Sequence, residues 1–589
     1  MLYPIRNKFR QITDLSGFWK FKIDKESKGE EEKYFNGFSS DIDIALPGSW
    51  NEQLEELGLL HYTGSAWYST DVYIPEEYKN KRIWLRIGSA DYYSKLWING
   101  KLVGENNCGF LPFEFEISQF VEPSQKASIV ILVNNELNES TIPQGISSED
   151  YFRENRMREE TFPPARFDFS PFGGIHRPVI LYTTPKNYIN KIKIDFKVIN
   201  NMKAIAKIHV ETQNIKQGSI RTAFKCKDFI ISSEAELKQN ASNFIFEIDN
   251  CNLWSPDNPF LYDFHVQAVD KNEITDEYEM PIGIREVKIS NNKLLLNGKE
   301  IFIRGFGKHE DFWAIGKGLF LPLIVKDFQI LKWIGANSFR TSHYPYAEEI
   351  LYYADKHGIL IIDEVPAVSI DTRYVNETTI NNHKSMLGRL VERDYNHPCV
   401  IMWAVGNEPN LVGADEYYDG SGRNYWKQIF EYARTLDKTR PFTVPNCQRA
   451  GVDDPVFEFS DVLTINRYYG WYENPGQINK AIELMSNEMD TIYKKYNKPV
   501  FVTEFGADTI SGFHSTSDQL FTEEYQAKLL EEYIKLIESK DYTIGEHVWN
   551  FADFRTPQHF RRVVMNMKGV FTRNREPKLA AFKIKELWK

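Results

Sequence analysis

The sequence predicts a multidomain protein in which two β-sandwiches precede a C-terminal (β/α)8 barrel. Three observations along its 589 residues lead to this prediction. Short aromatic-rich runs fill residues 1–185, residues 186–285 alternate apolar with polar side chains, and residues 286–589 alternate apolar runs with helical patterns. Because such a chain is too long for one hydrophobic core, we expect one domain in each of these three regions.

Residues 1–185 are predicted to form a jelly-roll β-sandwich like those of sugar-binding domains. Runs such as AWYSTDVYIP and ASIVILV have the composition of strands, and no ten-residue stretch shows convincing helical periodicity. Asn99-Gly100 lies between SKLWI and KLVG, which predicts a hairpin with a type I′ turn. Aromatic residues make up 14% of the whole chain, and this suits many strands or a sugar-binding surface.

Residues 186–285 are predicted to form a smaller, immunoglobulin-like sandwich. In KIKIDFKV (191–198) every second residue is apolar, and Ala206, Ile208 and Val210 continue the same alternation. Alternation with a period of two indicates strands with one buried and one exposed face. Some seven such runs in about 100 residues are typical of an immunoglobulin-like fold.

Residues 286–589 are predicted to form the barrel. Between the apolar runs, Tyr525, Leu529, Tyr533 and Ile537 repeat every four residues behind a possible Thr522 cap, as in a helix. Eight strand–helix units in about 300 residues fit a (β/α)8 barrel, with a doubly wound sheet as the alternative. The eight runs are IFIRGFG (301–307), ANSFRTS (336–342), GILIIDEV (358–365), VIMWAVGNE (400–408), PFTVPN (441–446), DVLTINRYY (461–469), KPVFVTEFG (498–506) and YTIGEHVWNF (542–551).

Composition excludes several classes of protein. The net charge of −11 argues against a general nucleic-acid binder. The five cysteines include no C-x-x-C pair, so no disulfide framework or zinc knuckle is expected. The N-terminus has no apolar signal-peptide segment, and no apolar run approaches the roughly 18 residues of a membrane span. We therefore expect a cytoplasmic protein without a nucleic-acid or membrane partner. Without a Gly-rich phosphate loop or a metal-spaced His/Cys cluster, we expect no cofactor and no metal.

Two acids stand where barrel enzymes carry their catalytic groups, at the carboxyl ends of strands. Glu408 ends the fourth predicted strand in WAVGNEPN, and Glu504 ends the seventh in VFVTEFGAD. Either acid alone could merely cap the following helix, but two carboxylates from separate strands are what glycoside hydrolysis requires. Asp363-Glu364 on strand three and Glu546 in strand eight are competitors that position alone does not exclude.

The motifs around these acids, G-N-E-P and T-E-F-G, resemble family 2 of the glycoside hydrolases. Members of that family share the order of sandwich, immunoglobulin-like domain and barrel, so the resemblance covers the whole chain. Within the family, five further segments look like those of β-glucuronidases. These are FDFSPFGGIHRPVILYTTP (167–185), GFGKHED (305–311), GANSFRTSHYPYAEE (335–349), NRYYGWY (466–472) and NMKGVFTRNREPK (566–578).

The resemblance implies a retaining exo-β-glucuronidase that hydrolyses small-molecule or oligosaccharide β-D-glucuronides through a covalent glycosyl-enzyme intermediate, and it suggests a homotetramer. It makes Glu408 the general acid/base and Glu504 the nucleophile, with carboxyls about 5–5.5 Å apart. It also implies that Asn407 donates to the sugar 2-hydroxyl. We further expect Tyr468 to hydrogen-bond Glu504, and Arg340 to pair with Glu504 or Glu408 and so to lower the pKa of the nucleophile.

A glucuronide differs from other sugars by its carboxylate, which requires fixed cationic and amide donors. The family's N-x-K motif for this role matches Asn566 and Lys568, and Arg562 and Tyr472 match neighbouring contacts. Residues 555–578 carry seven Lys or Arg and one acid, which predicts a local positive patch. For Arg573 and Arg575 in this stretch, a solvated loop or an oligomer contact is the preferred interpretation.

Three further residues are candidates for contact with the sugar ring. By resemblance, Asp168 and His343 contact sugar hydroxyls, so that the first domain would complete the site of the barrel. Taken alone, Asp168 also fits a turn aspartate before Ser-Pro, and a lone histidine is usually structural. Trp549, at the end of strand eight, could form the apolar floor on which a pyranose face stacks.

The sequence departs from the best-known bacterial β-glucuronidases after IIDEVPAV, where only about a dozen residues precede the next helix. A short loop suggests an open aglycone side that admits bulky or polymeric glucuronides. Three alternatives to a β-glucuronidase are weighed: a β-galacturonidase, which needs the same carboxylate clamp; a β-galactosidase, which gives no reason for N-x-K; and a non-catalytic carbohydrate-binding protein, which both acids argue against.

Overall fold

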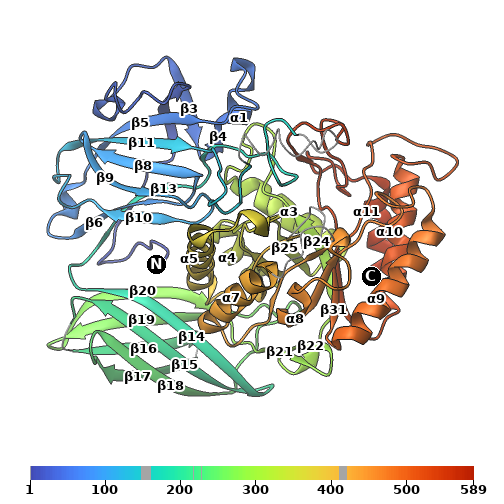
Figure 1. The fold of residues 1–589 in the computed structure, drawn as a ribbon. Helices are drawn as coiled ribbons and strands as arrows, with labels where there is room; N and C mark the ends of the chain where they lie inside the picture. The colour runs from blue at the N-terminus through green and yellow to red at the C-terminus, as the bar shows by residue number, and fades with distance from the viewer. Residues whose placement is uncertain (1, 147–160, 216–217, 227–228, 410–420) are drawn as a thin grey trace.

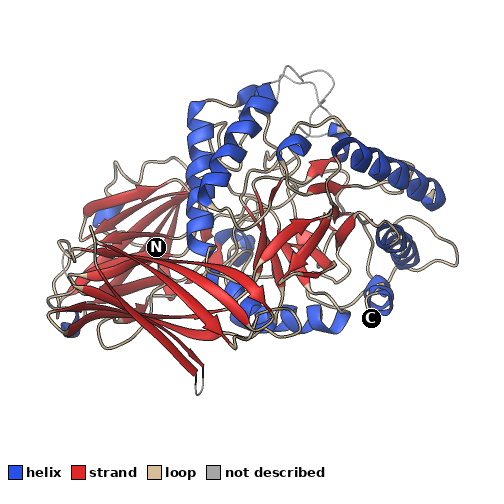
Figure 2. Cartoon of the chain, turned by 90° about the horizontal axis from the view of Figure 1, so that it is seen from below, coloured by secondary structure: helices blue, strands red, loops and turns tan. Residues whose placement is uncertain are grey.

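The computed structural model describes residues 2–146, 161–215, 218–226, 229–409 and 421–589. Two β-sandwiches lie one above the other on one side of the molecule, and the barrel fills the other side (Figure 1). In the view of Figure 2, helices surround the strands of the barrel. The predicted fold class is therefore confirmed. Within the described residues, no helix combines the length and apolar character that crossing a membrane requires.

The first sandwich consists of a four-stranded sheet, a six-stranded sheet and a small three-stranded sheet. Asn99 and Gly100 have φ angles of 51° and 74° and join β8 to β9, as the predicted hairpin turn requires. Trp19, Phe21 and Leu85 belong to its buried core. Its strands are β1 (Ile12–Asp14), β2 (Gly17–Asp24), β3 (Ile42–Leu46), β4 (Gly48–Ser49), β5 (Ser65–Tyr73), β6 (Arg82–Ile87), β7 (Ala90–Asp91), β8 (Tyr93–Ile98), β9 (Lys101–Asn106), β10 (Phe113–Glu116), β11 (Lys126–Asn134), β12 (Gly174–Ile175) and β13 (Val179–Thr184).

The second sandwich pairs a three-stranded sheet with a four-stranded sheet. Ile192, Ile194 and Ile208 are buried, while the intervening lysines are not, as the period of two predicts. The strands are β14 (Tyr188–Asn200), β15 (Lys203–Gln213), β16 (Ser219–Cys226), β17 (Phe229–Glu236), β18 (Ala241–Asp249), β19 (Tyr262–Asp270) and β20 (Glu273–Ile282).

The third part opens with a small meander of β21 (Val287–Ser290), β22 (Lys293–Leu296) and β23 (Lys299–Glu300), followed by the barrel. The first barrel strand pairs in parallel with the last, β24 with β32, which closes the sheet and excludes a doubly wound fold. The strands are β24 (Ile303–Lys308), β25 (Ser338–Thr341), β26 (Leu360–Glu364), β27 (Val400–Ala404), β28 (Phe442–Thr443), β29 (Asn446–Cys447), β30 (Leu463–Asn466), β31 (Val500–Glu504) and β32 (Thr543–Val548).

One predicted barrel strand is broken. The run 441–446 divides into β28 and β29, with Pro445 just before β29, because proline cannot donate to a ladder. The predicted Thr522 cap accepts from Tyr525 N at the start of α10. The principal helices of the barrel are α3 (Leu321–Ile334), α4 (Glu348–His357), α5 (Glu377–Asp394), α7 (Ser421–Leu436), α8 (Val456–Phe459), α9 (Ile478–Tyr496), α10 (Glu523–Glu538) and α11 (Leu579–Leu587).

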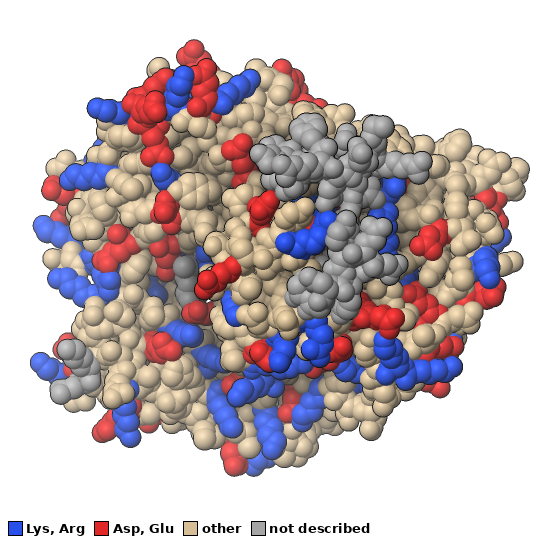
Figure 3. Space-filling view, viewed as in Figure 1, with Lys and Arg blue, Asp and Glu red and all other residues tan. Residues whose placement is uncertain are grey.

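Buried ion pairs hold Arg573 and Arg575, and the pair of Arg573 with Glu52 joins the barrel to the first domain. Arg573 donates to Glu52 at 2.6 Å and also to Asp311, while Arg575 donates to Asp327 at 2.9 Å. Both arginines are buried, so the prediction that they lie in a solvated loop was wrong. Their carboxylate partners lie hundreds of residues away in sequence, and local composition therefore could not reveal them. On the face shown in Figure 3, basic and acidic side chains are likewise interspersed.

Candidate active site

The barrel brings the two predicted catalytic acids to the carboxyl ends of its strands. Glu504 is the last residue of β31, and Glu408 follows β27 after a short turn. The amide of Glu408 donates to the Pro445 carbonyl at 2.8 Å, and its φ of 45° is uncommon for a residue other than glycine. Glu504 is buried and Glu408 is partly exposed. Backbone hydrogen bonding therefore fixes the direction of Glu408.

The carboxylate of Glu504 accepts hydrogen bonds from two side chains, a phenol and a guanidinium. The Tyr468 hydroxyl donates to its Oε2 at 2.6 Å, and the fully buried guanidinium of Arg340 donates to its Oε1. Both contacts were predicted from sequence and are confirmed. Arg340 also donates to Glu364 at 2.5 Å and to Asn407 Oδ1 at 3.3 Å. One arginine therefore holds the candidate nucleophile and links it to the residue before Glu408.

Glu408 has a different partner. Asn466 Nδ2 donates to its Oε1 at 2.9 Å, and the side-chain oxygen Oδ1 of Asn466 accepts from Thr503 Oγ1 at 2.8 Å. Sequence reasoning missed Asn466, although it ends strand β30 two residues before Tyr468. A neutral amide now orients the candidate acid, whereas a cation and a phenol orient the candidate nucleophile.

Burial governs the protonation of the two carboxyls. It raises the pKa of Glu504 to about 8 despite the opposing effect of Arg340, and it also raises the pKa of Glu408. Arg340 lowers the pKa of the nucleophile, as predicted, but desolvation outweighs the cation. The Tyr468 donor acts in the same direction as Arg340, because it too stabilises the ionised form of Glu504.

The competing acids have other surroundings. Glu364 accepts from Arg340 at 2.5 Å and from His343 Nδ1 at 2.7 Å, so it supports the residues around Glu504. Asp363 accepts from Thr341, and Glu546 accepts from the indole of Trp588 at 2.7 Å. All three acids are fully buried. They therefore fit supporting roles better than a direct role at the sugar.

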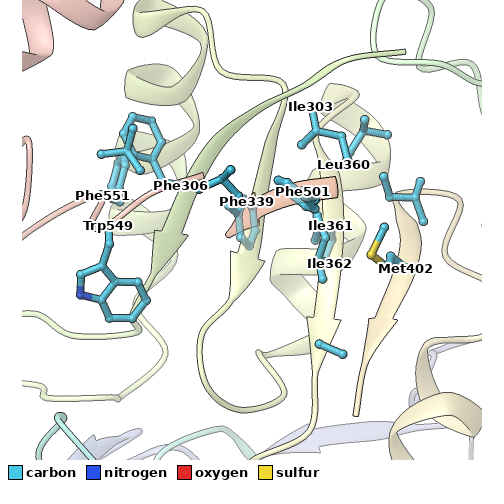
Figure 4. Close-up of a cluster of buried hydrophobic side chains, with 14 of the residues drawn as sticks. Ile303, Phe306, Phe339, Leu360, Ile361, Ile362, Met402, Phe501, Trp549 and Phe551 are labelled. Atoms are coloured by element: carbon cyan, nitrogen blue, oxygen red, sulfur yellow. The ribbon is translucent and has the colours of Figure 1, made fainter. Parts of the chain in front are cut away.

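His343 and Trp549 lie next to the nucleophile. Their rings stack with centroids 5.1 Å apart, and His343 Nε2 lies 3.8 Å from Glu504 Oε1. Burial, with Arg340, depresses the pKa of His343 far below its usual range, so the imidazole is neutral. Figure 4 shows Trp549 at the edge of the buried cluster that includes Phe306 and Phe339. Phe169 of the first domain also reaches His343, at 6.1 Å between centroids.

The residues predicted to bind the sugar carboxylate come together as one hydrogen-bonded group. Lys568 Nζ donates to the Tyr472 hydroxyl at 2.8 Å, and Arg562 donates to the same hydroxyl at 2.7 Å. Asp168 accepts from Arg562 at 2.6 Å and from Asn566 Nδ2 at 2.8 Å. We call this group the clamp: Asp168, Tyr472, Asp508, Arg562, Asn566 and Lys568.

Asp508 is the clamp residue that sequence reasoning missed. Its Oδ2 accepts from Lys568 at 2.5 Å and from Arg562 at 3.2 Å. The only signal in the sequence is its position in TEFGAD, just beyond the end of β31. Together with Asp168, it balances the two cations of the clamp. The positive patch predicted for residues 555–578 therefore does not form.

One group of three side chains, among the residues that the structure describes, could hold a metal ion: Asp355, His397 and Cys399. Asp355 lies in α4, and His397 and Cys399 lie just before β27, at the opposite end of that strand from Glu408. Asp355 already accepts from His397 at 2.5 Å and from the Cys399 amide at 2.9 Å. These hydrogen bonds account for the group without an ion.

Three family models together match nearly all of the chain, from residue 12 to residue 589. A sugar-binding domain of glycosyl hydrolases family 2 matches residues 12–185, a second model of that family matches residues 181–285, and its TIM barrel domain matches residues 287–589. A β-glucuronidase from Paenibacillus borealis is 38% identical, over 100% of this chain and 98% of its own length. The human β-glucuronidase is 36% identical, over 100% and 92%.

Solved structures of β-glucuronidases also match this chain over its whole length. A β-glucuronidase from an uncultured Clostridium superposes with a TM-score of 0.91 at 38% identity, covering 100% of this chain and 99% of its own. The Ruminococcus gnavus β-glucuronidase in complex with D-glucuronic acid gives the same TM-score at 36% identity and the same coverage. From these matches and from the domain order, the chain belongs to family 2 of the glycoside hydrolases.

Proposed function

We propose that this protein is a retaining exo-β-glucuronidase, which hydrolyses β-D-glucuronides to glucuronate and an aglycone alcohol. One observation carries the proposal: the Tyr468 ring, bonded through its hydroxyl to Glu504, packs 5.2 Å from the ring of Tyr472, whose hydroxyl bonds Lys568. The catalytic pair and the clamp are therefore neighbours. A sugar carboxylate held by the clamp places the anomeric carbon near Glu504.

The proposed reaction has two steps. Glu504 attacks the anomeric carbon, while Glu408 transfers its proton to the departing aglycone oxygen. Glu408, now ionised, takes a proton from water, and the resulting hydroxide oxygen displaces Glu504 from the anomeric carbon. Each step inverts the anomeric centre, so the product retains the configuration of the substrate. Asn407 is proposed to contact the sugar 2-hydroxyl, and Trp549 and His343 to face the ring.

The proteins that this chain resembles support a β-glucuronide as the substrate. Relatives that match over the whole chain are named β-glucuronidase, and the R. gnavus enzyme has been solved with D-glucuronic acid and with D-glucaro-1,5-lactone. A β-galactosidase would have no use for the cations of the clamp. A homotetramer and a cytoplasmic location stay predictions.

We also propose an open aglycone side. Only residues 365–376 connect β26 to α5, with one short 3-10 turn at Thr372–Tyr374. Asp371 in this connection is paired with Arg373 and with Arg166 of the first domain, at 2.5 and 3.2 Å. A glucuronate-terminated oligosaccharide should therefore be hydrolysed at least as efficiently as a small aryl glucuronide. A strong preference for the small substrate in kcat/KM would overturn this part of the proposal.

The function is tested with a panel of 4-nitrophenyl β-glycosides at one pH. We expect the glucuronide to be hydrolysed far faster than the glucoside and the galactoside. The galacturonide differs only at the C4 hydroxyl and is the most demanding comparison. A higher kcat/KM for the galacturonide would reassign the enzyme, and the absence of turnover on every member of the panel would leave a binding protein.

A further inference from the structure

Asp508 occupies a position between the two cations of the clamp. Its Oδ2 accepts from Lys568 Nζ at 2.5 Å and from Arg562 Nη1 at 3.2 Å, and its Oδ1 accepts from the Met567 amide at 2.8 Å. The Met567 amide lies between the two side chains of the N-x-K motif. One carboxylate thus fixes both cations and the backbone that carries the motif.

Most of the hydrogen-bond donors of Arg562 are already used within the clamp, so few remain for a substrate. Its Nε and Nη2 donate to Asp168, Nη2 donates also to Tyr472, and Nη1 donates to Asp508. A guanidinium has five donors, so four are already used. Arg562 therefore acts on the sugar mainly through its neighbours, rather than as the direct contact that its sequence position suggested.

Lys568 and Tyr472 keep donors for a ligand. Lys568 Nζ uses two of its three N–H groups, on Asp508 and Tyr472. The Tyr472 hydroxyl accepts from Lys568 and from Arg562, so its own hydrogen is directed elsewhere. The Tyr472 side chain is substantially exposed, whereas that of Lys568 is fully buried. Asp508 holds the lysine directly, and the lysine in turn donates to the Tyr472 hydroxyl.

The two carboxylates of the clamp differ in accessibility. The Asp168 side chain is 44% exposed and that of Asp508 is 4% exposed. The exposed Asp168 can therefore give way to an incoming sugar carboxylate, whereas the buried Asp508 stays in place against Lys568 and Arg562. Burial alone would raise the pKa of Asp508, but Lys568 and Arg562 lower it below its ordinary value, so this carboxylate stays ionised. It is the permanent counter-ion of the clamp.

We propose that Asp508 is a positioning residue that gives the enzyme its specificity for uronates, by holding Lys568 and Arg562 where the sugar carboxylate binds. The inference rests on the proposed function and names the residue behind its selectivity. Asp508 contacts neither Glu408 nor Glu504 among the interactions of the described chain. Its removal should therefore affect recognition of the carboxylate and leave the chemistry at the anomeric carbon intact.

The variant Asp508→Asn tests the proposal, because it keeps the shape of the side chain and removes its charge. For 4-nitrophenyl β-glucuronide, kcat/KM should fall roughly 30-fold or more, chiefly through KM, while the value for the glucoside should change less than about threefold. Inhibition of glucoside hydrolysis by free D-glucuronate should weaken by a similar factor. In a Lys568→Ala background, Asp508→Asn should cause a smaller further loss, since only Arg562 remains for it to hold.

A matched control lies in the second sandwich. Asp276 of β20 is also a buried acid paired with a cation, Arg10 at 2.5 Å, and among the described interactions it contacts no clamp residue. Asp276→Asn should alter thermal stability and leave the ratio of glucuronide to glucoside activity unchanged. Equal losses on both substrates in Asp508→Asn, or an undiminished loss in the Lys568→Ala background, would overturn the proposal. A wild-type enzyme without preference for the glucuronide would instead refute the proposed function.

Discussion

The catalytic pair, Glu408 and Glu504, and the clamp are two regions in which carboxylates balance buried cations, but they use different parts of the fold. In each, buried cations are balanced by two carboxylates: Arg340 by Glu504 and Glu364, and Lys568 with Arg562 by Asp508 and Asp168. The pair and its arginine stand on barrel strands or shortly after them. The clamp is assembled from loops, the short strand β34 (Met565–Asn566) and the first domain. Chemistry and specificity thus depend on different elements, so the two should be separable by mutation.

The largest effect should come from the nucleophile. Glu504→Ala removes the group that forms the covalent intermediate, so kcat should fall by roughly 10⁴-fold or more. Because the loss concerns the anomeric carbon, the glucuronide and the glucoside should be affected alike. A thermal unfolding midpoint close to that of the wild type would show that the variant folds. Unchanged turnover would remove Glu504 from the mechanism.

Lys568→Ala should have the next largest effect, and it should affect the glucuronide only. Losing a buried, charged hydrogen bond opposite a carboxylate costs about 2–5 kcal/mol, or roughly 30-fold to several-thousand-fold in kcat/KM for the glucuronide. The glucoside, which has no carboxylate, should be nearly indifferent. Arg561→Ala is the matched control, since it removes the same charge from an exposed neighbouring position. Equal losses on both sugars would make Lys568 a structural residue.

Glu364→Gln should impair the catalytic step rather than the recognition of the sugar carboxylate. The neutral amide cannot replace the carboxylate that accepts from both Arg340 and His343. Leaving buried donors poorly paired costs about 1–3 kcal/mol, which corresponds to roughly 5- to 150-fold in kcat. The ratio of glucuronide to glucoside activity should not change. Rate measurements on both sugars check this. A change confined to the glucuronide would place Glu364 in the recognition of the carboxylate instead.

Sequence reasoning found the parts of the molecule whose signals are local. Glu408 and Glu504 follow apolar runs, so strand ends predicted their positions, and the hairpin at Asn99-Gly100 was equally visible. Asn466 and Asp508 were missed, and Glu364 was considered only as a competing catalytic acid. Their roles depend on hydrogen bonds between strands and loops that only the closed barrel brings together.

The predicted positive patch failed for the same reason. Local charge counts residues 555–578 alone, but in the fold Arg555 and Arg573 pair with Glu52, Arg575 pairs with Asp327, and Lys578 pairs with Asp553. Buried cations need partners, and the partners came from other parts of the chain. A charged run in a sequence therefore predicts a need for acids nearby as readily as it predicts a positive surface.

The smallest expected effect concerns pH. The Tyr468 hydroxyl donates to Glu504 and lowers its pKa, against the larger opposing effect of burial. In Tyr468→Phe the nucleophile loses that donor, its pKa rises, and a higher pH is needed to ionise it. The acidic limb of kcat/KM should therefore move upward by roughly one pH unit, the equivalent of one charge-assisted hydrogen bond. Since the hydroxyl does not touch the clamp cations, the shift should be the same for the glucuronide and the glucoside. A limb that stays in place, or moves to lower pH, would mean that Tyr468 does not tune the ionisation of Glu504.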